Sequence, residues 1–169
     1  MPTVYNKYDT NAAILSGDTM FAKAFTYLLK ADKTQIHDLV EVFTNASIEV
    51  CEGQAMDMCF EERDDVSIEE YIEMIRLKTG VLLASALKLG AITAHAQKKD
   101  MDYLYDFGLN IGIAFQLQDD ILDCWSNLED FGKVTGTDIA DNKKTFLYLK
   151  SLELASNEDK EVLTKYFSS

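Results

Sequence analysis

The sequence is poor in proline, in basic residues and in long apolar runs, and each shortage narrows the possible folds and functions. Its single proline is Pro2, so few positions force a helix to end, which favours an all-α fold. Sixteen Lys and Arg against 29 Asp and Glu give a net charge of −13, which argues against nucleic acid as the main partner. No apolar run is long enough to span a membrane and no signal peptide opens the chain, so we expect a cytoplasmic protein without a transmembrane segment.

Cysteine is also scarce, and its spacing excludes two kinds of stabilising site. Cys51, Cys59 and Cys124 fit neither a zinc site nor a disulfide framework, so we expect reduced and mostly buried thiols. The chain has no repeat, low-complexity segment or long linker, and its length suits one domain over residues 1–169. A small phosphorylated ligand remains compatible with the acidic composition, because a bound metal ion can reverse the local charge.

Helical periodicity runs almost from end to end. The clearest helix start is Ser67-Ile-Glu-Glu70, a capping box in which Val66 and Tyr71 occupy the positions of a hydrophobic staple. We expect antiparallel long helices joined by short turns, over residues 11–30, 35–57, 67–98, 100–125, 143–155 and 157–167.

An acidic stripe interrupts the apolar pattern of the fourth expected helix. At 100° per residue, Gln116, Asp119, Asp120 and Asp123 fall within an arc of about 100°. Three like charges on one face are unfavourable unless solvent, protonation or a cation relieves them. No Lys or Arg lies between residues 109 and 126 to offset the repulsion. The stripe therefore suggests a divalent metal site.

Two further segments carry polar groups in unexpected places. Lys78 and Thr79 lie inside the apolar third helix, where the lysine either extends to solvent or presents its charge to an anion in the bundle. The loop from Gly132 to Asp138 brings Lys133 back past the aspartate helix, and Lys143 follows it. Taken alone, this loop is a solvated connection. Taken with the stripe, these lysines and a carboxylate-bound Mg²⁺ are what a diphosphate site requires.

At this point the sequence resembles the trans-isoprenyl diphosphate synthases, which include farnesyl and geranylgeranyl diphosphate synthases. Five segments carry the resemblance, in family order: Ala13-Ile14-Leu15-x-Gly17-Asp18, Gly53-Gln54-x-x-Asp57, Lys78-Thr79, Phe115-Gln116-x-x-Asp119-Asp120-x-x-Asp123, and Gly132-Lys133 with Gly136-Thr137-Asp138-Ile139 and Lys143-x-Thr145. The fourth segment is similar to the family's second aspartate-rich motif.

The resemblance implies a helical bundle of the isoprenoid synthase type and a prenyltransferase that condenses isopentenyl diphosphate with an allylic diphosphate. By the same resemblance, Asp119 and Asp123 would hold Mg²⁺ with support from Asp120. Lys78, Lys133 and Lys143 would contact the allylic diphosphate. Thr79 and Gln116 would lie beside the reacting carbons, where their oxygens could stabilise positive charge. Product chain length is not readable from these segments.

The resemblance also implies what lies outside the chain. The family's first aspartate-rich motif has no counterpart here, since Asp64-Asp65 lacks the third aspartate, and we expect the family's last helices to be missing as well. We therefore expect an incomplete bundle that has little or no synthase activity alone. The family's homodimer interface corresponds to the first two helices, which are rich in aromatic residues, so we expect a homodimer. The alternatives are a non-catalytic synthase-like subunit or helical interaction protein and, less favoured, a class I terpene cyclase.

Overall fold

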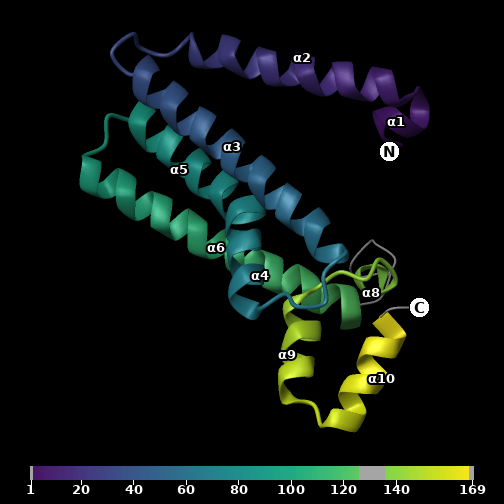
Figure 1. Cartoon of the computed structure of the whole chain (residues 1–169). Helices are drawn as coiled ribbons and strands as arrows, with labels where there is room; N and C mark the ends of the chain where they lie inside the picture. The colour runs from purple at the N-terminus through teal and green to yellow at the C-terminus, as the bar shows by residue number, and fades with distance from the viewer. Residues whose placement is uncertain (1, 126–135, 168–169) are drawn as a thin grey trace.

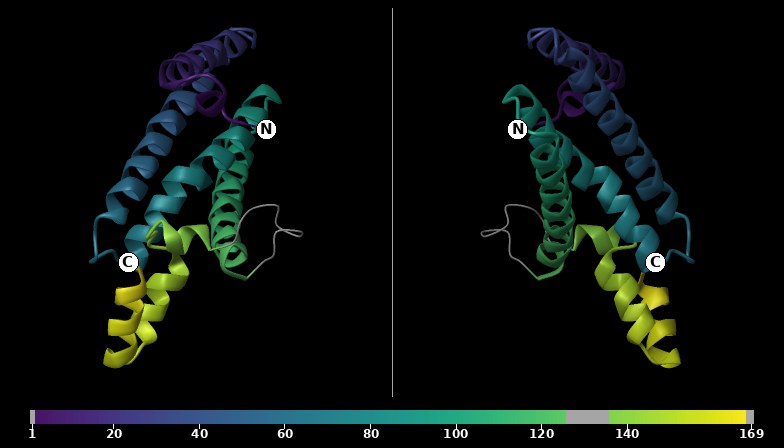
Figure 2. Two further views of the ribbon diagram at one scale, coloured as in Figure 1. Left: turned by 90° about the vertical axis from the view of Figure 1, so that its right-hand side faces the viewer. Right: turned by 90° about the vertical axis from the view of Figure 1, so that its left-hand side faces the viewer.

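The computed structural model describes residues 2–125 and 136–167, and every regular element in these ranges is helical. Three long helices, α3 (Ile36–Glu61), α5 (Val81–Thr93) and α6 (Lys98–Trp125), lie side by side with α5 in the middle (Figures 1 and 2). Short connections join antiparallel neighbours. The expected all-α architecture is confirmed.

The remaining helices lie at the two ends of this layer. At one end α2 (Thr10–Leu28) meets the start of α3 and extends away from it at an angle, and the short α1 (Val4–Lys7) precedes it (Figure 1). At the other end α9 (Phe146–Leu154) and α10 (Asn157–Phe167) form a hairpin-like pair. The single-turn helix α8 (Thr137–Ala140) lies near the end of α6, where it shapes the functional site.

The third expected helix is divided into three parts. It begins as α4 (Ile68–Ile75), passes through the π-helical turn η1 (Arg76–Gly80) and continues as α5. The Ser67 capping box is present, with the Ser67 hydroxyl accepting from the Glu70 amide and the Glu70 carboxylate accepting from the Ser67 amide. The predicted capping box is confirmed, and it could be predicted because all its parts are local in sequence.

The end of α5 differs from the expectation. The helix stops at Thr93 rather than continuing to residue 98, because His95 adopts a left-handed φ of 53°. The buried Gln35 amide donates to the Ile92 carbonyl at 2.6 Å and also contacts the His95 ring. The Ile92 carbonyl at the helix end thus accepts from a side chain distant in sequence as well as from the His95 amide.

Helix α3 also differs from expectation, because it extends four residues past 57 to Glu61. Cys59 consequently lies on the last turn of a helix rather than in a loop, and its side chain is exposed. Cys51 is exposed as well and Cys124 is half-buried, so the prediction of mostly buried thiols is wrong. The apolar character of these cysteine side chains therefore does not place them in the core.

The core lies where α4, α6 and α9 meet. One cluster of buried side chains joins Phe60, Tyr71, Met74 and Ile75 to Tyr148 and Leu149 of α9. A second, smaller cluster packs Ala46 of α3 against Leu77 and Val81. The first cluster forms the floor beneath the acidic stripe, so core packing and site geometry depend on the same residues.

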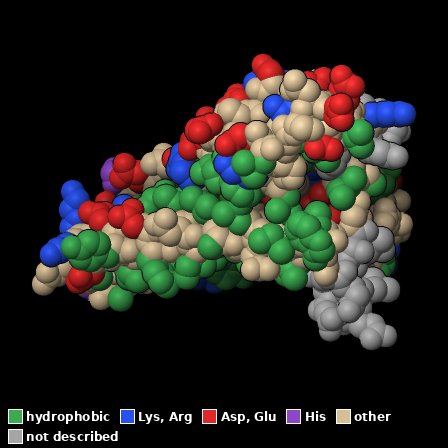
Figure 3. All heavy atoms as spheres, turned by 90° about the horizontal axis from the view of Figure 1, so that it is seen from below, with side chains coloured by type: hydrophobic (Ala, Val, Ile, Leu, Met, Phe, Trp, Pro, Cys, Tyr) green, Lys and Arg blue, Asp and Glu red, His purple; other side chains and the backbone are tan. Residues whose placement is uncertain are grey.

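Large apolar side chains also remain on the surface. In the view from below, hydrophobic side chains form a long band across the molecule (Figure 3). Helix α6 exposes Tyr103, Phe107, Ile111 and Phe115, and α2 exposes Ile14, Leu15, Met20 and Tyr27. None of the helices in the described ranges is both long enough and apolar enough to cross a membrane.

Candidate functional site

A charged pocket of about 180 Å³ lies where η1, α6 and the segment after α8 converge on the end of α3. Its apolar wall is formed by the core residues Phe60, Tyr71, Met74 and Ile75. Its ionisable lining consists of four aspartates and three lysines, which sum to a formal charge of −1: Asp57, Asp119, Asp120, Asp138, Lys78, Lys143 and Lys144. Groups of opposite sign that are far apart in sequence therefore share one small space.

Helix α6 reaches this pocket because glycines let it approach its neighbours closely. A Cβ on Gly112 would lie 2.5 Å from the Gly80 Cα, and one on Gly108 would lie 2.7 Å from the Ala84 Cα. Neither contact is possible with a side chain present, so these glycines fix the distance between the backbones. The next turns of α6 then bring Gln116, Asp119 and Asp120 to the pocket.

Lys78 and Thr79 lie on the π-helical turn η1. Single π-turns within α-helices occur often at functional sites, because the wider turn changes the direction of the side chains. Lys78 forms a 2.6 Å ion pair with Asp57 of α3, and both side chains are largely buried. The lysine does not extend into open solvent, so the surface interpretation of Lys78 is not supported. Asp57, which the sequence left without a role, is its counter-ion.

A chain of hydrogen bonds connects η1 to the acidic stripe. The Thr79 hydroxyl donates to Gln116 Oε1 at 3.1 Å, and Gln116 Nε2 donates to Asp120 Oδ1 at 3.2 Å. The Tyr71 hydroxyl donates to Asp120 Oδ2 at 2.5 Å. Burial raises the pKa of Asp120, and the hydrogen bonds from Tyr71 and Gln116 oppose that rise. Burial and then the Asp120 charge raise the pKa of Tyr71, which keeps its hydroxyl protonated as a donor.

Asp123 has a different environment from the other two aspartates of the stripe. Its carboxylate accepts from the Thr137 hydroxyl at 2.8 Å and from the Asp138 amide at 3.1 Å. Its backbone carbonyl accepts from the Gly136 amide. Asp123 thus fastens the start of α8 to the end of α6, and it is not among the residues that line the pocket.

The segment after α8 supplies two lysines to the pocket. Lys143 pairs with Asp138 at 3.1 Å; burial alone would lower the Lys143 pKa, but the bond and charge of Asp138 raise it overall. The Lys144 side chain is only 3% exposed and donates to Asn142 Oδ1 at 2.9 Å. Sequence reasoning missed Lys144, because nothing in the sequence shows that it is buried. Lys133 falls outside the described residues.

The pocket residues fit a magnesium ion. In the described residues, the carboxylates of Asp119, Asp120 and Asp123 do not converge on one point, so they do not form a ready-made three-ligand cage. Magnesium does not require such a cage, since it usually binds one or two carboxylates, several waters and substrate phosphate oxygens. Asp119 and Asp120 line the pocket beside lysines that could take the remaining phosphate charge.

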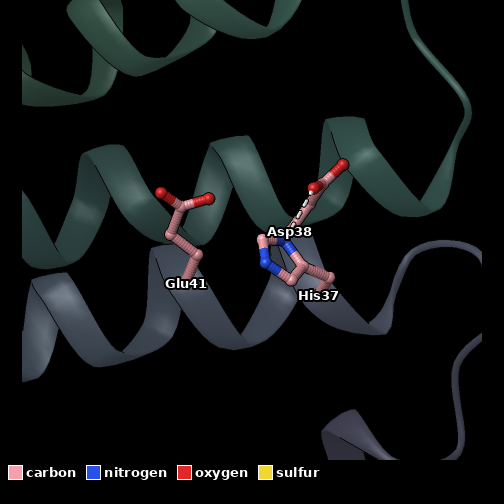
Figure 4. A group of neighbouring side chains, drawn as sticks. All are labelled: His37, Asp38 and Glu41. Atoms are coloured by element: carbon pink, nitrogen blue, oxygen red, sulfur yellow. Dashed lines mark hydrogen bonds and ion pairs between the residues drawn. The ribbon is translucent and has the colours of Figure 1, made fainter.

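Another acidic group occurs on the outer face of α3. His37, Asp38 and Glu41 come within metal-binding distance of one another, and His37 contacts Asp38 at 3.5 Å (Figure 4). All three side chains are exposed, and none of them lines the charged pocket. Solvent can relieve their charge, so this trio has the character of an ordinary helix surface.

The sequence matches a known protein family over its whole length. The polyprenyl synthetase family model matches residues 1–169. The chain belongs to the polyprenyl synthetase family. Among curated relatives, the short chain isoprenyl diphosphate synthase of Methanothermobacter thermautotrophicus is 43% identical over 99% of this chain and 52% of that protein. The geranylgeranyl diphosphate synthase of Sulfolobus acidocaldarius is 41% identical over 98% of this chain and 51% of that protein.

Solved structures show the same relationship to the polyprenyl synthetases. A crystal structure of a geranylgeranyl pyrophosphate synthase matches with a TM-score of 0.94 and 47% identity, over 99% of this chain and 50% of that one. The geranylgeranyl pyrophosphate synthetase of Pyrococcus horikoshii Ot3 matches with a TM-score of 0.90 and 40% identity, over 97% and 51%. The chain therefore spans about half the length of the relatives it matches.

Proposed function

We propose that this chain supplies one wall of the active site of an isoprenyl diphosphate synthase. The observation that carries the proposal is the convergence of Lys78 and Lys143 with Asp119 and Asp120 on one pocket. The relatives are named as synthases that make prenyl diphosphates, which agrees with a site for a diphosphate and a divalent cation. The proposed substrates are an allylic diphosphate and isopentenyl diphosphate.

In the proposed reaction, the carbon–oxygen bond of the allylic diphosphate breaks and leaves an allylic cation and diphosphate. The double bond of isopentenyl diphosphate then attacks the cation, a carbon–carbon bond forms, and a proton passes to the departing diphosphate. Bound Mg²⁺ supplies positive charge for the leaving group. Asp119 and Asp120 would hold that ion, with Asp123 keeping the end of α6 and α8 together.

The protein's own cations stabilise the same leaving group. Lys78 and Lys143 can each donate from an ammonium group that is already positioned by a carboxylate, Asp57 and Asp138 respectively. An ammonium has three N–H donors, so each lysine retains donors for phosphate oxygens after pairing. Fixed charges of this kind favour a transition state in which negative charge develops, because little reorganisation is needed.

We also propose a homodimer formed through α2 and α3. Phe21, Phe25 and Phe43 stack with ring centroids 5.2–5.6 Å apart, yet Phe21 remains 50% exposed. The neighbouring apolar side chains of α2 are also exposed, and a second copy would remove them from water. Sedimentation at micromolar concentration should show a dimer, and a monomer would contradict this part of the proposal.

A segment exchange tests the proposed activity. In the M. thermautotrophicus synthase, the matching segment would be replaced by this chain, and extension of an allylic diphosphate by radiolabelled isopentenyl diphosphate would be measured. We expect Mg²⁺-dependent extension that falls at least 100-fold in the chimera carrying Lys78→Ala. A folded chimera that binds both substrates but does not extend them, while the parent does, would count against the proposal.

A further inference from the structure

Tyr71 is a buried polar residue that the proposed reaction leaves without a role. Its side chain is 2% exposed and lies in the core cluster between α4, α6 and α9, with its ring 6.5 Å from that of Phe146. The sequence suggests only a hydrophobic staple at the start of α4. In the structure its hydroxyl reaches past the core to Asp120 on α6, 49 residues away.

The Asp120 carboxylate, which Tyr71 holds in place, sets the direction of the hydrogen bonds in the chain that follows. An ionised carboxylate can only accept, so Asp120 takes one hydrogen from Tyr71 and one from the Gln116 amide nitrogen. With its nitrogen directed to Asp120, Gln116 presents its oxygen to Thr79. The Thr79 hydroxyl hydrogen is therefore committed to Gln116.

This arrangement determines what Thr79 can offer to a ligand. A hydroxyl has one hydrogen and two acceptor lone pairs. Because the hydrogen points to Gln116, the Thr79 oxygen retains only acceptor capacity for other partners. An oxygen that only accepts is attractive to positive charge. It cannot turn a donor toward a cation, as a freely rotating hydroxyl could.

We propose that Tyr71 is a positioning residue, which acts through Asp120 and Gln116 to keep the Thr79 oxygen as an acceptor facing the cationic carbons of the allylic substrate. This inference rests on the proposed function. Without the Tyr71 hydroxyl, the Asp120 carboxylate loses one of the donors that hold it, beside Gln116 and the Phe146 backbone, and can rotate. The Gln116 amide can then turn over, and the Thr79 hydrogen is free to point at the substrate.

Tyr148 provides a matched control. It is another buried tyrosine of the same core cluster, 7% exposed, but it does not line the charged pocket. Tyr71→Phe and Tyr148→Phe each remove one hydroxyl from a buried tyrosine and keep the ring. A purely structural effect of losing such a group should therefore appear in both variants.

The test compares two probes in the full chain with Mg²⁺ present. One is an allylic thiolodiphosphate, which is neutral at the reacting carbons, and the other is an analogue with an ammonium group there. We expect Tyr71→Phe to weaken binding of the ammonium analogue about 10-fold and binding of the neutral probe no more than about 2-fold. Tyr148→Phe should leave the ratio of the two affinities at the wild-type value. An unchanged ratio in Tyr71→Phe would overturn the inference, whereas failure of both probes to bind the wild type would contradict the proposed function itself.

A second measurement does not depend on how well the variants fold. The hydroxyl proton of Tyr71 is buried and bonded to a carboxylate, so proton NMR of the wild-type chain should detect it as a slowly exchanging resonance far downfield. Nuclear Overhauser contacts should join it to the Phe146 ring. If this proton exchanges as fast as that of an exposed tyrosine, Tyr71 does not hold Asp120 and the inference is wrong.

Discussion

Gly53 is the residue on α3 where a single methyl group should disturb the site most directly. A Cβ at this position would lie 2.4 Å from the Lys78 backbone nitrogen and 2.8 Å from both the Lys78 Cα and the Leu77 Cβ. Ordinary contact begins at 3.4 Å, so α3 and η1 must move apart by about 1 Å. The neighbours are mostly backbone atoms, which cannot rotate out of the way.

The expected cost of Gly53→Ala follows from two opposing terms. Forcing a methyl group into a packed interior costs about 1–3 kcal/mol. Replacing glycine by alanine within a helix returns about 0.5–1 kcal/mol. We therefore expect a net loss of about 1–2 kcal/mol, which for a chain of this size lowers the Tm by roughly 2–8 °C.

Gly90 offers a matched control in α5. No atom lies within 4 Å of a Cβ built there, so Gly90→Ala should gain helix propensity without a clash. Its Tm should rise by roughly 1–4 °C. Thermal unfolding followed by circular dichroism measures both variants on one scale, and they should move in opposite directions.

The same substitution should also affect ligand binding. A displacement of Lys78 by about 1 Å is enough to impair a positioned charge severely. Calorimetry with inorganic diphosphate and Mg²⁺ should show at least a 10-fold loss of affinity in Gly53→Ala and none in Gly90→Ala. If Gly53→Ala is as stable as Gly90→Ala and binds diphosphate normally, the close contact between α3 and η1 does not position Lys78.

Three further substitutions test the charges around the pocket. Asp57→Asn keeps a hydrogen-bond acceptor for Lys78 but removes the negative charge beside it, so inorganic diphosphate without Mg²⁺ should bind about 5-fold more tightly. Burial raises the pKa of Asp120, so its carboxyl keeps its proton to a higher pH in the folded wild type than in the unfolded chain, and Asp120→Asn removes this carboxyl. Wild-type stability should therefore fall as pH rises from about 3.9 toward that raised value, and the variant should lose this slope. Glu70→Gln removes a carboxylate whose pKa is lowered, first by the Ser67 amide and then by Arg63. In the wild type, the stability contributed by Glu70 should be present above about pH 4.3 and lost as pH falls through the lowered value, and the variant should not show this loss.

For each of these three predictions, one outcome would contradict it. Weaker diphosphate binding in Asp57→Asn would mean that the Asp57 charge helps more by positioning Lys78 than it costs by neutralising it. An unchanged pH slope in Asp120→Asn would show that burial does not raise its pKa. Equal acid unfolding of wild type and Glu70→Gln would show that the capping carboxylate contributes nothing. Urea unfolding at a series of pH values measures the last two.

Features that depend on residues close in sequence could be read from the sequence. The Ser67 capping box lies within one turn, and the arc shared by Gln116, Asp119 and Asp120 follows from helix geometry alone. The end of α5 could not be predicted in this way, because Gln35, 57 residues away, donates a second hydrogen bond to the Ile92 carbonyl. The close contacts of the π-turn η1 with Gly53 of α3 and Gly112 of α6 likewise join residues that are distant in sequence.

The different environments of the three aspartates could not be predicted from the sequence for the same reason. On one helix face they are equivalent, but in the structure Asp120 and Asp123 have different partners. Tyr71 and Gln116 hold Asp120, while Thr137 and the Asp138 amide hold Asp123. Gln116 lies on α6 itself, but Tyr71 comes from α4 and Thr137 and Asp138 from α8, which the helical pattern of α6 cannot show. The sequence predicted which residues share one face of α6, and tertiary packing gives these residues different hydrogen-bond partners.

The central claim is that Lys78 and the α6 aspartates form one wall of a site for magnesium and an allylic diphosphate. Isothermal titration of the chain with geranyl diphosphate, with and without Mg²⁺, tests this most directly. The account predicts saturable binding that strengthens at least 10-fold when Mg²⁺ is present and is lost in both Lys78→Ala and Asp119→Ala. Binding that is indifferent to Mg²⁺ and survives both substitutions would contradict it.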